Sequence, residues 1–311
     1  MKAAQISQYG HPDAVKIVEV EEPTIGSDQV LVEVYASSLN PWDTIVREGY
    51  AQSFLPLELP VTLGGDLSGV VAKVGADVQT VAVGDEVFGT AGVPMGSGAL
   101  AEFAATKPEH LAKNPTTVSY VEAAAATLTG VSAYQALVEH LKLATGQKVL
   151  IHGGAGGIGS LAIQIAKNIG AYVATTATGD GVAFAKSLGA DEVIDYKTES
   201  FDELIHDYDA VFDTVAGETF ERSFKVVKKG GMIVSMNAQP NPELAEKYGV
   251  ETVHQQTHTT TDALEALGKL IDDGVVKVQV DHVFPLADIQ AAFEARESTA
   301  VKGKIAVEIK K

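Results

Sequence analysis

Glycines cluster between a predicted strand and a predicted helix at residues 148–168. Val149–Ile151 is an apolar run typical of a buried strand, and residues 160–168 carry apolar side chains at helical spacing. A glycine-rich turn in this context brings backbone N–H groups close to a pyrophosphate, and the helix N-terminus adds the positive end of its dipole. The pattern predicts a dinucleotide-binding turn made of Gly154, Ala155, Gly156, Gly157, Ile158 and Gly159.

Each glycine has a separate task in such a turn. Gly154 allows the tight turn, Gly156 and Gly157 let the backbone approach a pyrophosphate, and Gly159 lets the helix pack close to the strand. Glycine-rich segments also serve as plain strand-to-helix turns, which is the alternative interpretation. The flanking strand and helix favour the nucleotide site.

The end of the next strand-like run, residues 174–178, determines which dinucleotide fits. An Asp or Glu there would bind the ribose hydroxyls of NAD and repel the extra phosphate of NADP. The chain instead has Thr176 and Thr178, whose small side chains leave room for that phosphate and favour NADP(H). Asp180 follows closely, and Lys186 and Lys197 are the candidate phosphate partners, with a solvated surface position as the alternative for each lysine.

Composition excludes several classes of function. A length of 311 residues with 46% hydrophobic content suits a soluble protein of two domains. The 41 acidic and 23 basic residues give a net charge of −18, which disfavours nucleic acid and anionic membranes as partners. Because cysteine is absent, the chain has no disulfides, thiolate metal sites or cysteine nucleophiles. The N-terminus shows no leader pattern and no apolar run approaches a membrane span, so we expect a cytoplasmic protein.

The elements that position the glycine turn alternate along the second part of the chain. Residues 16–108 show short strands and turns, as at Val30–Tyr35 and Gly69–Val74, whereas residues 121–141 have helical spacing. Six strand-like runs separated mostly by helical patterns then predict a doubly wound parallel sheet. These runs are Val149–His152, Tyr172–Thr176, Glu192–Asp195, Ala210–Thr214, Met232–Met236 and Thr252–Gln255.

The C-terminal residues are expected to return to the first domain. They read as a helix, a strand, a helix and a strand, at Thr261–Asp272, Val275–Val280, Ala287–Ala295 and Lys304–Ile309. The predicted division is therefore a domain of residues 1–117 completed by 263–311, and a dinucleotide-binding domain of residues 118–262.

Several short motifs occur in order along nearly the whole chain. They are Leu39–Asp43, Leu63–Val71, Val83–Phe88, Leu128–Leu137, the glycine turn, Leu188–Asp191 and Lys302–Ile305. Together they resemble the medium-chain dehydrogenase/reductase superfamily, specifically its zinc-free quinone oxidoreductase branch, the zeta-crystallin-like proteins. The resemblance implies a Rossmann doubly wound parallel sheet inserted in a GroES-like mostly-β domain, an active-site cleft where the two meet, and a homodimer or homotetramer.

The resemblance also implies that no metal is bound. In the zinc alcohol dehydrogenases, the stretches matching 40–43 and 64–66 carry a cysteine and a histidine that bind zinc. Here those positions hold Asn40 and Gly65, an amide and a residue without a side chain, so a catalytic zinc has no suitable ligands. His254 and His258 are four residues apart, but their strand-like surroundings argue against a metal pair.

Without a metal, the acceptor must take hydride readily. Quinones and α,β-unsaturated carbonyls fit, because the developing charge spreads to a distant oxygen and the protein need only supply hydrogen-bond donors. By position in the motifs, the resemblance places Asn40, Asp43 and Thr129 at the nicotinamide and substrate end of the cleft, and Tyr196, Val215 and Lys304 along the cofactor. Tyr50 is a further candidate catalytic residue, as a donor to the substrate oxygen.

Structural roles are the alternatives for several of these residues. Asn40 before Pro41 is a common turn start, Tyr50 fits an ordinary half-buried aromatic, and Asp66 fits a loop stabiliser. Some quinone reductases have a tyrosine where this chain has Ile45, which weakens the case for quinones in particular. The leading hypothesis is an NADPH-dependent quinone or enone oxidoreductase. The alternatives are a cofactor-binding redox sensor or structural protein with little catalysis, and an enoyl-thioester reductase.

Overall fold

The computed structural model describes residues 1–92, 97–298 and 301–311 of the chain. The chain forms two compact units. The first consists of Met1–Leu128, Thr259–Asp273 and Val278–Lys311, and the second of Thr129–His258 and Gly274–Lys277. We call them the terminal unit and the central unit.

A parallel six-stranded sheet forms the central unit. Its strand order is β11-β10-β9-β12-β13-β14, so the chain starts in the middle of the sheet and builds first one half and then the other. The order and the parallel pairing confirm the predicted doubly wound sheet. The strands are β9 (Lys148–Ile151), β10 (Tyr172–Ala177), β11 (Glu192–Asp195), β12 (Tyr208–Asp213), β13 (Val227–Ser235) and β14 (Glu251–His254).

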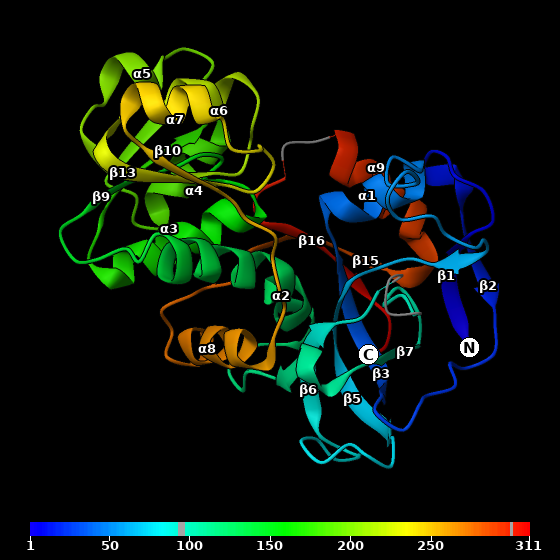
Figure 1. The fold of residues 1–311 in the computed structure, drawn as a ribbon. Helices are drawn as coiled ribbons and strands as arrows, with labels where there is room; N and C mark the ends of the chain where they lie inside the picture. Colours follow the sequence, from blue (N-terminus) through cyan, green and yellow to red (C-terminus); the bar gives the residue numbers. More distant parts are fainter. Residues whose placement is uncertain (93–96, 299–300) are drawn as a thin grey trace. The chain divides into compact units, whose positions relative to one another are not determined.

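Helices cover both faces of this sheet, as right-handed crossovers require. In Figure 1, α5, α6 and α7 lie on one side of the strands and α3 lies on the other. The apolar strand residues are buried against these helices, for example Val211 and Ile233 against Phe220 and Phe224. The helices are α3 (Gly157–Ile169), α4 (Asp180–Ser187), α5 (Phe201–Leu204), α6 (Glu218–Ser223) and α7 (Pro242–Tyr248).

The helical segment predicted over residues 121–141 is a continuous helical stretch. It starts as α2 (Tyr120–Tyr134) and continues as a π-helix from Gln135 to His140. The alanines at its start are fully buried, because small side chains let the helix pack closely. Within the described residues, no helix is long and apolar enough to span a membrane.

Mostly antiparallel strands form the terminal unit. One sheet has the order β15-β16-β3-β5-β6-β8, with β7 paired to β3, and a smaller sheet has the order β2-β1-β4. The strands of the larger sheet are β3 (Val30–Leu39), β5 (Asp66–Val74), β6 (Glu86–Thr90), β7 (Phe103–Thr106), β8 (Leu111–Lys113), β15 (Val280–Pro285) and β16 (Lys304–Glu308). Those of the smaller sheet are β1 (Lys2–Ile6), β2 (Val15–Glu19) and β4 (Val61–Thr62).

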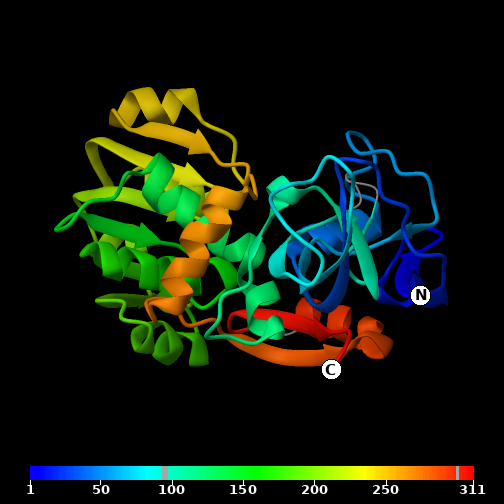
Figure 2. The ribbon, with the colours of Figure 1, turned by 90° about the horizontal axis from the view of Figure 1, so that it is seen from below.

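Three helices pack on these sheets. They are α1 (Pro41–Glu48), α8 (Thr261–Asp272) and α9 (Ile289–Ser298). Alternating apolar residues of β3 and β5 form one core with Val87 and Leu111, and Leu39 and Ile305 join a second core with Phe293 of α9. The last strand, β16, lies beside β3 although the two are far apart in the sequence (Figure 1; Figure 2).

One strand prediction was wrong. Val275–Val280 was expected to be a strand, but the strand β15 begins at Val280. Its partner β16 begins at Lys304, which pairs with Val280, so the residues before Val280 have no residue of β16 opposite them. Val276 is buried although it lies outside the sheet, so its apolar side chain reflects burial and not strand pairing.

Candidate functional site

The glycine turn joins the end of β9 to the first turn of α3. Gly153 has φ of +74°, a left-handed conformation that favours glycine, and the Gly156 N–H donates to the Gly153 carbonyl at 3.0 Å. A Cβ on Gly159 would lie 2.2 Å from the Gly153 carbonyl oxygen, and one on Gly154 would lie 2.1 Å from the Thr175 hydroxyl. Any side chain at these two positions would force the turn apart.

Hydroxyl groups of β10 hold the turn against the sheet. The Gly153 N–H donates to the Thr176 hydroxyl at 3.1 Å, and the Gly154 N–H donates to the Thr176 carbonyl at 3.0 Å. The Thr175 hydroxyl donates to the Ile151 carbonyl at 2.6 Å. Thr176 therefore supports the turn from behind, a contact that the sequence did not reveal.

A buried histidine extends this network. Nδ1 of His152 lies 3.2 Å from the Thr176 hydroxyl, and Nε2 lies 3.0 Å from the Ser223 hydroxyl. Burial lowers the pKa of His152 to about 4, against the opposing effect of the nearby Asp213 carboxylate. The ring is therefore neutral at physiological pH and connects the Thr176 and Ser223 hydroxyls by hydrogen bonds behind the glycine turn.

The other predicted cofactor residues of the central unit lie on or after the strand ends. Thr178 follows β10, and its hydrogen bond lowers the pKa of Asp195 at the end of β11. Lys186 is exposed on α4, while Tyr196 and Val215, which follow β11 and β12, are 56% and 53% exposed. The carboxyl ends of the strands thus present side chains that are free to meet a ligand.

Three strand ends of the terminal unit bring polar residues together. Ser38 of β3 pairs with Asp66 at the start of β5, and Leu39 pairs with Ile305 of β16. In antiparallel strands the next residue of one faces the preceding residue of the other, so Asn40 comes opposite Lys304. We call Ser38, Asn40, Asp43, Asp66 and Lys304 the amide cluster.

Asp66 is the acceptor at the centre of the amide cluster and has no exposed surface. Its Oδ2 accepts from the Ser38 hydroxyl at 2.6 Å and from Asn40 Nδ2 at 2.7 Å, and its Oδ1 accepts from the Leu128 N–H at 3.2 Å. The Lys304 ammonium lies 3.4 Å from Oδ2 and also donates to Asn40 Oδ1. Asp66 thus accepts from the Ser38 hydroxyl and the Asn40 amide and pairs with the Lys304 ammonium, whereas an aspartate that only stabilises a loop would accept from backbone N–H groups.

Asp43 lies in the first turn of α1 and is 4% exposed. Its carboxylate accepts from the backbone N–H of Asn40 at 2.7 Å, which closes the start of the helix. Burial raises the pKa of Asp43 to about 6, and Asp66 raises it further, while the Asn40 N–H, Lys304 and Arg296 act against the rise. Asp43 is therefore a carboxyl group that changes charge near neutral pH.

The remaining predicted catalytic residues lie in different surroundings. Tyr50 follows α1 and is 72% exposed, and the rings of Trp42 and Phe54, which are also exposed, have centroids 6.2 Å apart. Thr129 is buried on α2 directly after Leu128. The structure thus brings Asn40 and Asp43 together with Asp66 and Lys304, which the sequence had assigned other roles, and leaves Tyr50 on the surface of its unit. It adds Ser38 and Arg296, which the sequence did not single out.

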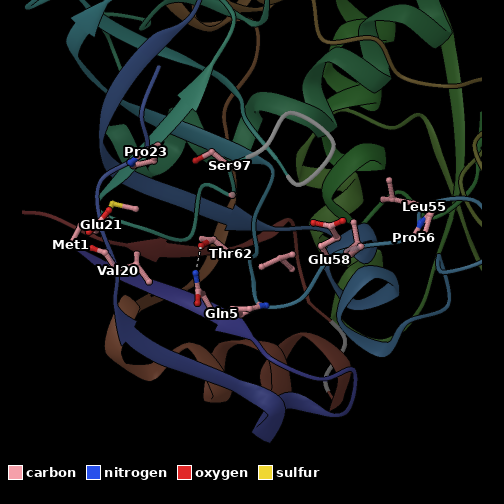
Figure 3. Close-up of a pocket in the computed structure, with 14 residues that line it drawn as sticks. Met1, Gln5, Val20, Glu21, Pro23, Leu55, Pro56, Glu58, Thr62 and Ser97 are labelled. Atoms are coloured by element: carbon pink, nitrogen blue, oxygen red, sulfur yellow. Dashed lines mark hydrogen bonds between the residues drawn. The ribbon is translucent and has the colours of Figure 1, made fainter. Parts of the chain in front are cut away.

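A hollow of about 580 Å³ also lies in the terminal unit. It is bordered by β1, β4 and residues 55–60, and the Gln5 amide donates to the Thr62 hydroxyl within it (Figure 3). Among the described residues that line it, none belongs to the amide cluster or to the predicted cofactor site. It therefore adds no chemistry to either.

Two family models match the chain. Residues 26–116 match the alcohol dehydrogenase GroES-like domain, which confirms the predicted GroES-like fold, and residues 188–307 match a family described as zinc-binding dehydrogenase. The chain is 35% identical to the chloroplastic NADPH-dependent alkenal/one oxidoreductase of Arabidopsis thaliana, over 99% of this chain and 79% of that protein.

Solved structures resemble the chain over its full length. The quinone oxidoreductase from Coxiella burnetii has a TM-score of 0.93 and 35% identity, covering 100% of this chain and 99% of that chain. The Escherichia coli quinone oxidoreductase complexed with NADPH has a TM-score of 0.90 and 28% identity, covering 99% and 100%.

The residues present do not fit the zinc ion that one family description mentions. In the described parts of the chain, no group of three or more His, Asp or Glu side chains is arranged to hold a metal ion. At the expected position, Asn40 and Asp66 already bind the Lys304 ammonium, and a divalent cation there would meet a like charge. Lys304 was predicted from the family motif, but its contact with Asn40 required the strand register.

Proposed function

The chain belongs to the zinc-free quinone oxidoreductase branch of the medium-chain dehydrogenase/reductase superfamily, and we propose that it transfers hydride from NADPH to a quinone or an α,β-unsaturated carbonyl compound. The glycine turn is the observation that carries this proposal. The turn leads from β9 of the parallel sheet into a thirteen-residue helix, and a Cβ on Gly159 would lie 2.2 Å from the Gly153 carbonyl oxygen, so only glycine fits there.

The residues of the turn fit a dinucleotide. Ala155, Gly157, Ile158 and Gly159 would hold the pyrophosphate through backbone N–H groups, while Gly154 and Gly156, whose N–H groups already donate to backbone carbonyls, would let the backbone approach it. Thr178 would leave space beside the adenosine ribose, and Thr176 would support the turn from behind. Lys186 would pair with the 2′-phosphate, and Tyr196 and Val215 would lie along the cofactor. When bound, reduced nicotinamide supplies the hydride.

The amide cluster would act on the acceptor. Hydride addition to a quinone or enone places negative charge on an oxygen, and a hydrogen-bond donor held in a water-poor site stabilises that charge. Asn40 is nearly fully buried and carries such a donor in Nδ2. Asp43 and Thr129 would line the same region, and Tyr50 would donate from its exposed position after α1.

Steady-state kinetics test the proposal. We expect NADPH oxidation with α,β-unsaturated ketones, α,β-unsaturated aldehydes and para-quinones, a lower kcat/KM with NADH, and no turnover of saturated alcohols. Preincubation with a strong chelator should leave the rate unchanged. Absence of turnover across this panel, together with tight NADPH binding, would favour the redox sensor or structural protein instead.

An enoyl-thioester in the same panel tests the other enzymatic alternative. Higher kcat/KM for the thioester than for the small enones would replace the proposed acceptor class. The cytoplasmic location, the homodimer or homotetramer and the division into residues 1–117 with 263–311 and 118–262 remain predictions.

A further inference from the structure

Lys304 and Asn40 form a buried contact between residues that are 264 positions apart. Lys304 is 5% exposed and Asn40 is 3% exposed, so protein groups and not water must supply the hydrogen-bond partners of both side chains. Removing an ammonium group from water is unfavourable unless strong partners replace the water. In this site the partners are Asn40 Oδ1 and the Asp66 carboxylate.

The chemistry of these two partners fixes which way the Asn40 amide faces. A side-chain amide can turn by about 180°, which exchanges its oxygen and its nitrogen. The Lys304 ammonium only donates hydrogen bonds, and the Asp66 carboxylate only accepts them. Both are satisfied when the amide oxygen faces Lys304 and the nitrogen faces Asp66, as the structure has it. The turned amide would place N–H groups against an ammonium and oxygen against a carboxylate.

One amide hydrogen remains for another acceptor. Asn40 Nδ2 carries two hydrogens, and across residues 1–92, 97–298 and 301–311 it makes one hydrogen bond, to Asp66 Oδ2 at 2.7 Å. A buried amide hydrogen without an acceptor is unfavourable, so such a group favours a ligand oxygen that can accept it.

We propose that Lys304 is a positioning residue, which locks the Asn40 amide so that its second N–H donates to the oxygen of the quinone or enone acceptor. This role rests on the proposed function. When bound, NADPH would supply the hydride by breaking a C–H bond of its nicotinamide, which leaves NADP⁺. At the acceptor a new C–H bond forms at the β-carbon, the electron pair of the carbon–carbon double bond moves toward the carbonyl, and the oxygen gains the negative charge. Water then supplies the proton that completes the reduction, and Asn40 keeps its own protons throughout.

The proposal also gives Lys304 a role different from cofactor contact. Its ammonium is paired with the Asp66 carboxylate and donates to Asn40 Oδ1, so it has its partners without the cofactor. A change of Lys304 should therefore alter turnover and leave NADPH affinity nearly unchanged.

Two substitutions of Lys304 separate its hydrogen bond from its packing. Lys304→Met keeps the length of the side chain and removes the donor, whereas Lys304→Gln keeps an N–H that can donate to Asn40 Oδ1. We expect Lys304→Met to lower kcat with an enone roughly 10–100-fold, somewhat less than the loss of a whole oxyanion donor. NADPH affinity should stay within about twofold, and Lys304→Gln should recover part of kcat.

A double-mutant cycle tests whether Lys304 acts through Asn40. Asn40→Ala removes the donor, so adding Lys304→Met to that variant should cause little further loss of kcat. If Lys304→Met reduces kcat by the same factor with and without Asn40, the positioning role is overturned. It is also overturned if Lys304→Met weakens NADPH binding while kcat is unchanged, which would make Lys304 a cofactor ligand.

A measurement without turnover separates this proposal from the proposed function. In the folded protein, the side-chain amide protons of Asn40 should give sharp NMR signals whose chemical shifts differ from those of an exposed asparagine, because the amide is held in one orientation. Lys304→Met should broaden these signals or shift them toward those of an exposed asparagine, and Lys304→Gln should largely leave them unchanged. Sharp, unshifted signals in a folded Lys304→Met would overturn the lock, whether or not the wild type reduces any acceptor. If Lys304→Met does not fold, Lys304→Gln and Asn40→Ala carry the same comparison.

Discussion

The two units build their sites from different materials. Around the glycine turn the central unit uses backbone N–H groups, threonine hydroxyls and a neutral histidine, and the buried Asp213 carboxylate at the end of β12 is held by hydrogen bonds from the Ser235 hydroxyl and backbone N–H groups. The terminal unit buries charged groups, with Asp43, Asp66, Lys304 and Arg47 all less than a tenth exposed. A neutral frame with oriented N–H groups suits an anionic ligand that brings its own charge, whereas buried charges suit a reaction in which charge develops.

The two units also differ in the interactions that stabilise each site. A buried ion in the terminal unit is held only as long as its partner stays in place, because an unpaired buried charge is strongly unfavourable. The glycine turn depends instead on close approach, where no side chain fits. The predictions below compare the two, beginning with the largest expected effect.

Two arginines give a matched test of burial. Arg47 is fully buried, stacks 4.9 Å from the Phe293 ring centroid and donates to Glu297 at 2.8 Å and to the Gly10 carbonyl at 3.0 Å. Arg47→Met should lower the free energy of unfolding by about 3–5 kcal/mol, because it leaves the carboxylates of Glu48 and Glu297 without their cation. Urea denaturation measures the change.

The control is Arg222 of the central unit. It lies 4.8 Å from the Phe201 ring centroid and pairs with Asp202, but its side chain is 37% exposed. Arg222→Met should lower the free energy of unfolding by only about 1 kcal/mol, because water screens the pair. Equal losses for the two variants would mean that burial of charge does not distinguish the units.

The glycine turn should be sensitive to a single methyl group. Gly159→Ala places a Cβ against the Gly153 carbonyl, so we expect NADPH affinity to fall at least 100-fold, or about 2.7 kcal/mol. Fluorescence titration of reduced cofactor measures this change. Gly268→Ala on α8 is the control, because its Cβ would lie 3.7 Å from Pro115, an ordinary contact, and affinity should be unchanged. Normal NADPH binding by Gly159→Ala would contradict the role of the turn.

Asp43 should make the terminal unit less stable as pH rises. Its pKa is about 6 in the folded chain against 3.8 for the free side chain, so the folded state holds its proton more tightly. The free energy of unfolding should fall by roughly 2–3 kcal/mol between pH 4 and pH 7 on this account. Asp43→Asn removes the titrating group, and denaturation at both pH values should show a smaller difference than in the wild type.

His152 should give the central unit the opposite dependence. Its pKa is lowered from 6.5 to about 4, so the unfolded state binds the proton more tightly between these values. This contribution to stability is fully present above pH 6.5 and is lost as pH falls toward 4, by roughly 1–3 kcal/mol. His152→Gln should flatten the loss, measured by urea denaturation from pH 7 to pH 4.5. A steeper loss in the variant would refute the neutral histidine.

The sequence alone determined the features that contiguous residues create. The glycine turn, the six strands of the parallel sheet and the helix Thr261–Asp272 follow from local patterns, since a turn and its flanking elements lie next to each other in the chain. The strand expected at Val275–Val280 failed because an apolar residue can be buried without pairing in a sheet.

Only the tertiary structure decided the amide cluster. Asn40 and Asp66 are 26 positions apart and Asn40 and Lys304 are 264 apart, and no local pattern links them. Their contact depends on the register by which β5 and β16 pair with β3, because a shift of one residue would turn each side chain to the other face of the sheet. The types of these residues could be read along the chain, but their hydrogen bonds exist only through that register.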